Sequence, residues 1–339
     1  MSAILRRLLA FVPTLAVVVV VTFALTHVLP GDPAAFFVAS PGADAGVVEA
    51  TRRALGLDEP LWRQFALYLG ALMRGDLGQS IVSGRPVLED LARRLPASAE
   101  LTLAAMAMAF ALALPLGALG AARPGGLTDR LGRLVAALGG GTPTFVTGLC
   151  LILLFYYAAG LAPAPFGRLS PSLAPPPHVT GLLSIDAALA LDARAFADAL
   201  AHLALPAMTL ALFAVAPLTR VTRAATAATL ASDFVRAARA NGLSRRRIAI
   251  SYVLRNAAAP ILTTVGLVFT AMLGAGVLVE RVFAWPGVGT YALDALLALD
   301  HAPVQGFVLA MATISLLVNL AIDVATTLID PRMRLLDHA

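Results

Sequence analysis

Six long runs of apolar residues dominate this chain of 339 residues. A helix needs about 20 mostly apolar residues to cross a bilayer, and each run reaches roughly that length. In lipid the backbone polar groups must be satisfied inside the protein, so such a segment forms a helix rather than an open strand. The pattern predicts an all-α integral membrane protein with six transmembrane helices. The expected spans are residues 8–29, 98–122, 134–160, 203–222, 256–279 and 305–328.

The composition agrees with a bilayer environment and excludes an internal ATPase. Charged residues make up 13% of the chain, whereas soluble domains carry about 25%. All 25 basic residues are arginine, and a phosphate-binding P-loop requires a lysine. The sequence also contains neither H-E-x-x-H nor G-x-S-x-G, which mark metalloproteases and serine hydrolases. We therefore expect a protein that is not an enzyme and holds no cofactor itself.

The distribution of arginine predicts the orientation of the spans. With the N-terminus inside, the inner segments hold fifteen arginines and four acidic residues, and the outer segments hold the other ten arginines. Loops facing the cytoplasm carry the arginine excess in membrane proteins, so both termini are expected in the cytoplasm. A cleaved signal peptide is the alternative for the first run, which is longer than the roughly 7–15 apolar residues of such a peptide.

This topology divides the chain into three parts. Residues 1–29 hold the N-terminus and the first span, residues 30–97 form a large external segment, and residues 98–339 form a five-helix core. The core includes a cytoplasmic loop at residues 223–255. Because the basic excess follows the topology, membrane lipid is an expected partner and nucleic acid is not.

Residues 60–74 of the external segment have the spacing of an amphipathic helix. Such a helix lies in the membrane interface, where aromatic side chains and arginine stems are favoured, or it packs inside a folded external cap. Periodicity alone leaves both arrangements open. The apolar and aromatic positions are Leu61, Trp62, Phe65, Tyr68, Leu69 and Leu72.

The cytoplasmic loop contains a short segment with the signals of both helix ends. Ser232 can cap a helix at its N-terminus, and Gly242 fits the left-handed position that follows a helix. Phe234, Ala238 and Asn241 then share one face, which favours insertion of an aromatic side chain into a partner. The alternative is a solvated basic loop held by anionic lipid.

Residues 233–243 (DFVRAARANGL), residues 253–257 (VLRNA) and Pro260 resemble the cytoplasmic loop of ABC importer permeases. More narrowly, they are similar to the first permease subunit of the dipeptide/oligopeptide/nickel family. The resemblance extends over nearly the whole chain. Further matches, in order and at family-like spacing, lie at residues 29–33, 55–61, 75–80, 94–101, 280–289 and 330–332.

The resemblance implies a transmembrane subunit of an ATP-driven importer in a bacterial inner membrane. Its partners would be a second homologous permease, two cytoplasmic ATPase subunits that carry ATP and magnesium, and an external solute-binding protein. Peptides are the implied cargo, with nickel chelates, glutathione-like molecules and oligosaccharides as alternatives. A self-contained secondary transporter or channel is the competing class. It would need mid-membrane ion sites and inverted repeats, which the sequence lacks.

The resemblance also implies the functional residues. Arg236 stands where the family's EAA-type motif has its glutamate, and the helix around it would couple the ATPase to the spans. The turn after the fifth span would re-enter over residues 283–300 and line the external mouth, although a surface turn with an interfacial tryptophan is the alternative. The implied coupling residues are Asp233, Phe234, Arg236, Ala237, Ala238, Arg239, Asn241 and Gly242, and the implied mouth residues are Trp285, Pro286, Gly287 and Gly289.

Overall fold

The computed structural model describes residues 3–28, 46 and 58–329, and over these ranges it confirms an all-α fold. Extended backbone pairs there only in an isolated bridge between Gln79 and Pro86. In chain order the helices are α1 (Ala3–Val28), α4 (Leu61–Met73), α5 (Val87–Ala122), α6 (Leu127–Gly141), α7 (Thr144–Leu151), the π-helix η1 (Ile152–Ala158), α8 (Leu183–Leu189), α9 (Ala193–Leu230), α10 (Asp233–Ala240), α11 (Arg245–Arg247), the π-helix η2 (Ile248–Leu254), α12 (Arg255–Val282), α13 (Val288–Leu297) and α14 (His301–Ile329).

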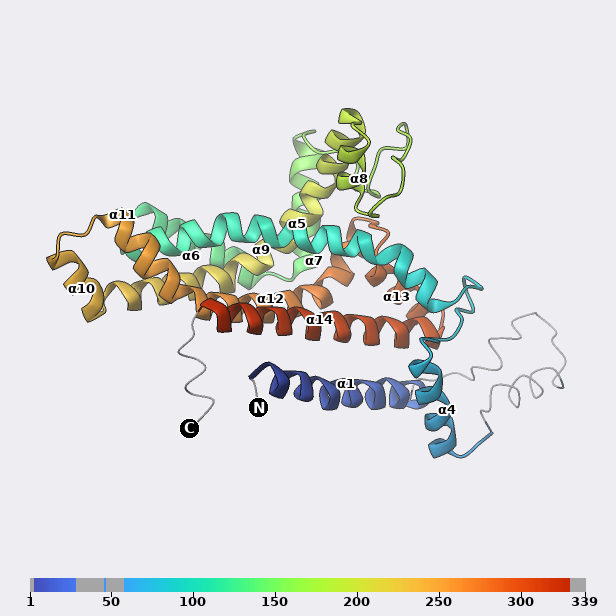
Figure 1. Cartoon of the computed structure of the whole chain (residues 1–339). Helices are drawn as coiled ribbons and strands as arrows, with labels where there is room; N and C mark the ends of the chain where they lie inside the picture. Colours follow the sequence, from blue (N-terminus) through green and yellow to red (C-terminus); the bar gives the residue numbers. More distant parts are fainter. Residues whose placement is uncertain (1–2, 29–45, 47–57, 330–339) are drawn as a thin grey trace.

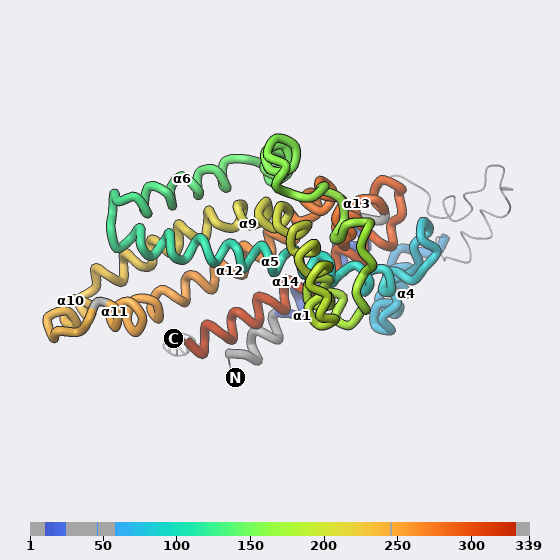
Figure 2. The backbone as a smooth tube through the Cα atoms, turned by 90° about the horizontal axis from the view of Figure 1, so that it is seen from above, coloured from blue at the N-terminus to red at the C-terminus, as the bar shows by residue number. Residues whose placement is uncertain are grey.

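The long helices lie side by side in one bundle (Figure 1). Figure 2 shows α6 along one side of α5 and α9, and α14 with α1 on the other side beyond α12. One end of the bundle carries α10 and α11, and the opposite end carries α4 and α13 (Figure 1). We call these the α10 end and the α13 end. The chain that follows α7, including α8, projects sideways as an arm (Figure 1).

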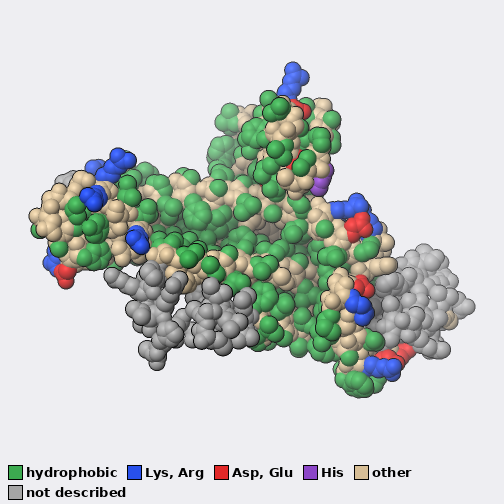
Figure 3. Space-filling model, viewed as in Figure 1, with side chains coloured by type: hydrophobic (Ala, Val, Ile, Leu, Met, Phe, Trp, Pro, Cys, Tyr) green, Lys and Arg blue, Asp and Glu red, His purple; other side chains and the backbone are tan. Residues whose placement is uncertain are grey.

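The length and hydropathy of the helices define a membrane protein. Among the described residues, α5, α9, α12 with η2, and α14 are each long and apolar enough to span a bilayer. The pair formed by α6 and α7–η1 adds a fifth span if it is counted as one. In Figure 3 apolar side chains cover the middle of the bundle, whereas charged ones gather at its two ends and on the arm. The count of six spans stays a prediction.

The expected span over residues 134–160 is not one continuous helix in the structure. The helix α6 ends at Gly141, α7 begins at Thr144, and the two segments are bent by 111°. Thr142 between them is extended, and Pro143 has no backbone N–H to continue a helix. Three consecutive glycines precede this break, which weakens the helix further because glycine loses the most conformational freedom on folding. The apolar run predicted the membrane location but not the bend.

Gly139 lets α6 approach α9 closely next to this bend. A Cβ atom at this position would lie 1.9 Å from the carbonyl oxygen of Leu212. We expect Gly139→Ala to lower the free energy of unfolding by about 1–3 kcal/mol, because a backbone atom cannot move away cheaply. Thermal unfolding of the purified chain in detergent measures this change. Gly141→Ala is the matched control, since its Cβ would meet no atom within 4 Å. Equal effects of both substitutions would refute this packing.

Two other spans extend well beyond their apolar runs. The helix α9 covers Ala193–Leu230, and α5 starts at Val87 and so crosses the expected boundary at residue 97. The side chain of Asp192 begins α9 by accepting hydrogen bonds from the N–H groups of Arg194 and Ala195, both at 3.0 Å. Such capping satisfies backbone donors at a helix start. Hydropathy marks the part of a helix in lipid, whereas the helix itself continues into water.

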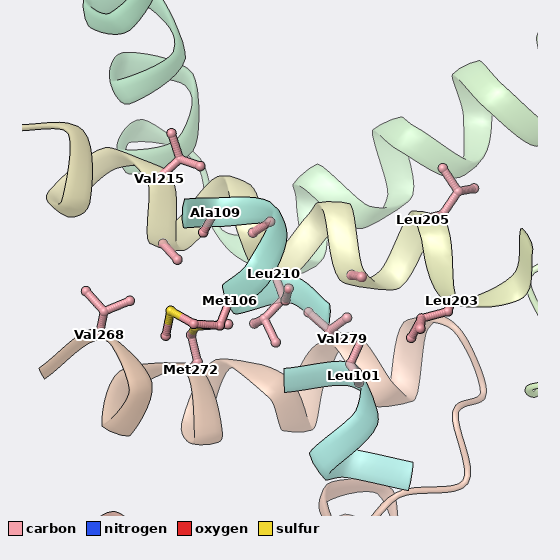
Figure 4. Close-up of a cluster of buried hydrophobic side chains, with 14 of the residues drawn as sticks. Leu101, Met106, Ala109, Leu203, Leu205, Leu210, Val215, Val268, Met272 and Val279 are labelled. Carbon is pink, nitrogen blue, oxygen red and sulfur yellow. The ribbon is translucent and has the colours of Figure 1, made fainter. Parts of the chain in front are cut away.

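The buried core lies where α5, α9 and α12 meet (Figure 4). Leu101, Leu210 and Met272 are among its largest fully buried side chains. Small residues between them let the helix backbones approach each other, as is common between membrane helices. The buried alanines include Ala105, Ala109, Ala113, Ala211 and Ala214.

The expected helix at residues 60–74 is confirmed as α4, which crosses α1 at the α13 end (Figure 1). The ring of Phe23 on α1 contacts Phe65 and Tyr68, with centroid distances of 5.2 and 5.7 Å. No residue of α4 is buried, and Trp62 is 72% exposed. Large apolar side chains left open on this helix favour a place in the membrane interface over packing inside a cap.

Candidate functional site

The short helix α10 closes the α10 end of the bundle between α9 and α11 (Figure 1). It rests on a small hydrophobic cluster of its own, separate from the main core. The buried members are Val235, Ala238, Ile248 and Val253, with Leu230, Leu243 and Tyr252 packed against them. Burial of these side chains holds α10 against η2 and the end of α9, so its position is set by packing as well as by the loop.

The C-terminal end of α10 has the expected geometry. Gly242 adopts a φ of +75°, which L-residues with a side chain rarely tolerate. Its N–H donates to the carbonyl of Arg239 at 3.0 Å, and the N–H of Leu243 donates to the carbonyl of Ala238 at 3.2 Å. This pair of bonds is a Schellman motif. The prediction of a left-handed glycine at this helix end is confirmed.

The N-terminal end of α10 differs from the prediction. Ser232 occupies the N-cap position with extended backbone, but its side chain makes no capping hydrogen bond. The Oγ–H donates instead to the carbonyl oxygen of Thr229 at 2.6 Å. The hydroxyl therefore satisfies one of the last carbonyl groups of α9 instead of capping α10. Serine side chains readily form such local hydrogen bonds to the backbone.

Seven of the eight expected coupling residues are exposed, five on α10 and two directly after it. Asp233 and Arg236 form an ion pair on α10 with 89% and 71% exposed side chains, and such an exposed pair contributes little to stability. Phe234 is 45% exposed and stacks on Tyr252, with ring centroids 6.4 Å apart. The exposed coupling residues are Asp233, Phe234, Arg236, Ala237, Arg239, Asn241 and Gly242.

The exception is Ala238, which is 4% exposed and packs in the hydrophobic cluster under α10. The expected common face of Phe234, Ala238 and Asn241 is therefore divided between the surface and the cluster below. Val235 is fully buried, and the prediction missed it as an anchor of α10. The spacing of Val235 and Ala238 by three residues was the available signal, because such positions lie on one side of a helix.

At the opposite end, a tight turn joins α12 to α13. Trp285 in this turn is 1% exposed, and its Nε1–H donates to the carbonyl oxygen of Ala97 at 2.8 Å. The alternative of an interfacial tryptophan is therefore wrong. Pro286 is exposed, whereas Gly287 and Gly289 are buried at the start of α13. The four expected mouth residues thus lie together, with one of them open to the surface.

A buried carboxylate organises this turn. Glu280 near the end of α12 is 3% exposed. It accepts a hydrogen bond from the Ser98 hydroxyl at 2.5 Å and another from the Thr290 N–H at 3.0 Å. The Ser98 oxygen in turn accepts from the N–H of Val288 at 2.9 Å. We call Glu280, Ser98, Val288 and Thr290 the Glu280 cluster. It ties the first turn of α13 to both α5 and α12.

The Glu280 cluster explains why glycine stands at two positions of the turn. A Cβ at Gly287 would lie 2.3 Å from Oε1 of Glu280, and a Cβ at Gly289 would lie 2.8 Å from Oε2. The carboxylate thus occupies the space that a side chain would need. The resemblance predicted roles for both glycines but none for Glu280 or Ser98. A carboxylate at the end of an apolar span was the available signal, since such a group is costly in lipid unless it is paired.

A second buried acid fixes the next turn of α13. The hydroxyl of Tyr291 donates to Oδ2 of Asp90 at 3.2 Å, and Asp90 is 1% exposed. Burial and the neighbouring Asp90 charge raise the pKa of Tyr291 far above its usual range. The Tyr291 hydroxyl is therefore protonated at neutral pH and can donate its hydrogen bond to Asp90. The guanidinium of Arg85 also lies 3.1 Å from Asp90, which compensates the buried charge.

The geometry defines a class of protein: a helical membrane protein with a small exposed helix at one end and an anchored short helix at the other. Comparison with known families identifies the class further. Residues 113–335 match the family of binding-protein-dependent transport system inner membrane components, and residues 1–102 match the N-terminal model of the same membrane component. The chain belongs to this family.

Curated relatives match along nearly their whole length. A probable D,D-dipeptide transport system permease protein of Escherichia coli K12 is 42% identical over 332 residues, covering 98% of this chain and 97% of the relative. The dipeptide transport system permease protein of the same strain is 38% identical, covering 98% of each chain. A glutathione transport system permease protein of that strain is 34% identical, covering 98% of this chain and 99% of the relative.

Proposed function

We propose that this chain is the transmembrane permease subunit of an ATP-driven, binding-protein-dependent importer of small peptides. Relatives that match 98% of the chain are permeases of a dipeptide transport system in Escherichia coli and of a di/tripeptide transport system in Pseudomonas aeruginosa. The partners would be a second homologous permease, two ATPase subunits that bind ATP and magnesium, and an external solute-binding protein. The bacterial inner membrane is the location that this assembly requires.

The proposed topology has six spans and both termini in the cytoplasm. In Figure 1, α1 and α14 lie next to each other and run in opposite directions, so the first and last described residues both lie toward the α10 end. That end also carries the arginines of the loop at residues 223–255. An arginine excess on one side supports a cytoplasmic α10 end.

The observation that carries the proposal is α10 itself. One face of this helix is buried against the hydrophobic cluster, and the opposite face is exposed. Its hydrophobic cluster fixes it to the ends of α9 and η2, so a displacement of α10 would move these helices with it. Phe234 supplies an aromatic side chain that is still 45% exposed. Aromatic residues of this kind commonly provide much of the energy of an interface. We assign α10 to the ATPase contact.

The cargo pathway would lie on the face that carries the bend of α6 and α7. A cavity of about 620 Å³ opens there between the bend, α9 and α12. Its lining is mainly apolar, with Phe145, Phe213 and Leu267 among the larger side chains, and it includes Arg220. In the assembly this face would meet the second permease, and the turn at residues 285–289 would border the external mouth of the pathway.

Uptake by a reconstituted complex tests the function. Proteoliposomes holding both permeases and both ATPases are expected to accumulate a labelled dipeptide only when ATP is inside and the binding protein outside. The isolated chain is expected to hydrolyse no ATP, because it lacks the lysine of a P-loop. Accumulation of dipeptide by liposomes containing this chain alone, or ATPase activity intrinsic to it, would contradict the assignment.

A further inference from the structure

A second cavity lies nearer the α10 end, between the first turns of α6 and the later part of α9. It has a volume of about 310 Å³, and three arginines and one acid line it together with Thr219. The arginines are Arg133, Arg220 and Arg223, and the acid is Asp129. The rest of the wall consists of leucine, glycine and alanine from α5 and α6. The lining of the cavity thus combines arginine side chains with apolar ones.

The carboxylate of the one acid that lines this cavity already has hydrogen-bond partners. Asp129 is 2% exposed and accepts hydrogen bonds from Arg223 Nε at 2.7 Å, from Arg133 Nη1 at 2.8 Å and from the N–H of Gly125 at 2.8 Å. These bonds leave guanidinium nitrogens of both arginines without an internal acceptor. One negative charge therefore stands against three positive charges.

Arg220 provides the excess charge with no internal partner. Within the described ranges its guanidinium makes no hydrogen bond and no ion pair. The hydroxyl of Thr219 in the same wall is buried and also lacks a partner there, whereas Thr209 and Thr229 on the same helix donate to the carbonyl four residues earlier. Unused donors beside uncompensated positive charge indicate a site for an anion.

The shape of the cavity and its place on the molecule select the kind of anion. The planar guanidinium group matches phosphate oxygens in a two-bond arrangement. The lining combines apolar residues with arginines, as a lipid with acyl chains and a charged headgroup requires. The site also lies at the start of α6, directly after a polar loop that contains Arg123, Pro124 and Gly126. Lipid headgroups are expected where a span passes into a polar loop, and basic pockets between spans bind such headgroups.

We propose that this cavity binds the phosphate headgroup of an anionic phospholipid from the leaflet at the α10 end. Arg220 is the main contact, and Arg133 and Arg223 contribute the nitrogens that Asp129 does not use. The headgroup bridges α6 and α9, and so steadies the first half of the bent span against the helix that leads to α10. Only the naming of that leaflet as cytoplasmic depends on the proposed topology, and the binding itself does not depend on transport.

Lipid titration of the purified permease complex in detergent tests the site. Phosphatidylglycerol is expected to raise the midpoint of thermal unfolding in a saturable way, whereas phosphatidylcholine gives no saturable rise. Arg220→Gln is expected to weaken the apparent affinity for phosphatidylglycerol about fivefold, the effect of one basic residue near an anionic membrane surface. Arg130→Gln is the matched control, because Arg130 is exposed in the same region but does not line the cavity.

The readout is the lipid-dependent shift, so a variant that is merely less stable does not imitate loss of the site. Equal affinity of the Arg220→Gln and Arg130→Gln complexes would overturn the proposal. The same holds for a saturable shift that phosphatidylcholine reproduces. An equal shift from millimolar inorganic phosphate alone would show that the cavity takes free phosphate and that no lipid is required, which also overturns it.

Discussion

Gly242→Val is expected to abolish ATP-driven uptake by the reconstituted complex while the chain still inserts in the membrane. Gly242 has a φ of +75°, and a β-branched residue reaches this conformation only at a cost of about 1–2 kcal/mol. The space around its Cβ position is open, so the cost comes from the backbone alone. The loop can avoid it by unwinding the last turn of α10, which removes the Schellman hydrogen bonds and displaces the helix. Dipeptide uptake and co-purification of the ATPase measure the effect.

Gly242→Asn is the matched control for this experiment. Asparagine tolerates the left-handed conformation far better than valine does, so uptake by this variant is expected to stay near the wild-type level. If both variants transport normally, the loop at residues 223–255 is only a basic topology signal and the assignment of α10 fails. Loss of uptake in both variants would point to a steric clash with a partner rather than to backbone strain.

Phe234→Ala is expected to act on the same contact without changing the backbone. Loss of an aromatic side chain from a buried interface costs roughly 2 kcal/mol or more, so ATPase co-purification should fall steeply. Ile250→Ala is the control, since Ile250 is 54% exposed on the neighbouring η2. A Phe234→Ala complex that keeps its ATPase subunits through gel filtration would rule out Phe234 as the main contact.

The second large effect is expected at Glu280. Glu280→Ala removes the acceptor of two donors, the Ser98 hydroxyl on α5 and the Thr290 N–H in the first turn of α13. Leaving such donors unsatisfied lowers the free energy of unfolding by about 1–3 kcal/mol. Glu89→Ala is the control, because Glu89 is half-exposed and pairs with Arg93 only at the surface. Chemical unfolding in detergent and dipeptide uptake compare the two variants.

A double substitution separates the geometry of this cluster from simple loss of stability. Gly287→Ala alone is expected to destabilise by about 1–3 kcal/mol, because its Cβ would lie 2.3 Å from the Glu280 carboxylate. In the Glu280→Ala background the three atoms that crowd this Cβ are gone, so Gly287→Ala should then cost little. Such strong non-additivity is the mark of residues in direct contact. A double variant that loses the sum of both single effects would contradict the close approach.

The features that the residue pattern predicted are local ones. Long apolar runs suffice for membrane helices because lipid leaves the backbone no other way to satisfy its hydrogen bonds. Gly242 could be assigned to a left-handed helix end for a similar reason, since the requirement arises within a few residues of chain. The spacing in residues 60–74 likewise predicted α4, because helical periodicity needs no knowledge of what the helix contacts.

Other features depend on which helices become neighbours, and only the tertiary structure decided them. Glu280 and Ser98 are 182 positions apart, and nothing near either residue indicates that packing will bring them together. The same holds for Ala238, whose burial depends on η2 lying beneath α10. The bend after Gly141 combines both kinds of cause: glycine and proline weaken the helix locally, but the 111° angle depends on how α6 and α7 pack against α9 and α12. Long-range packing selects one arrangement among many that the local signals allow, because burial rewards contacts regardless of their separation along the chain.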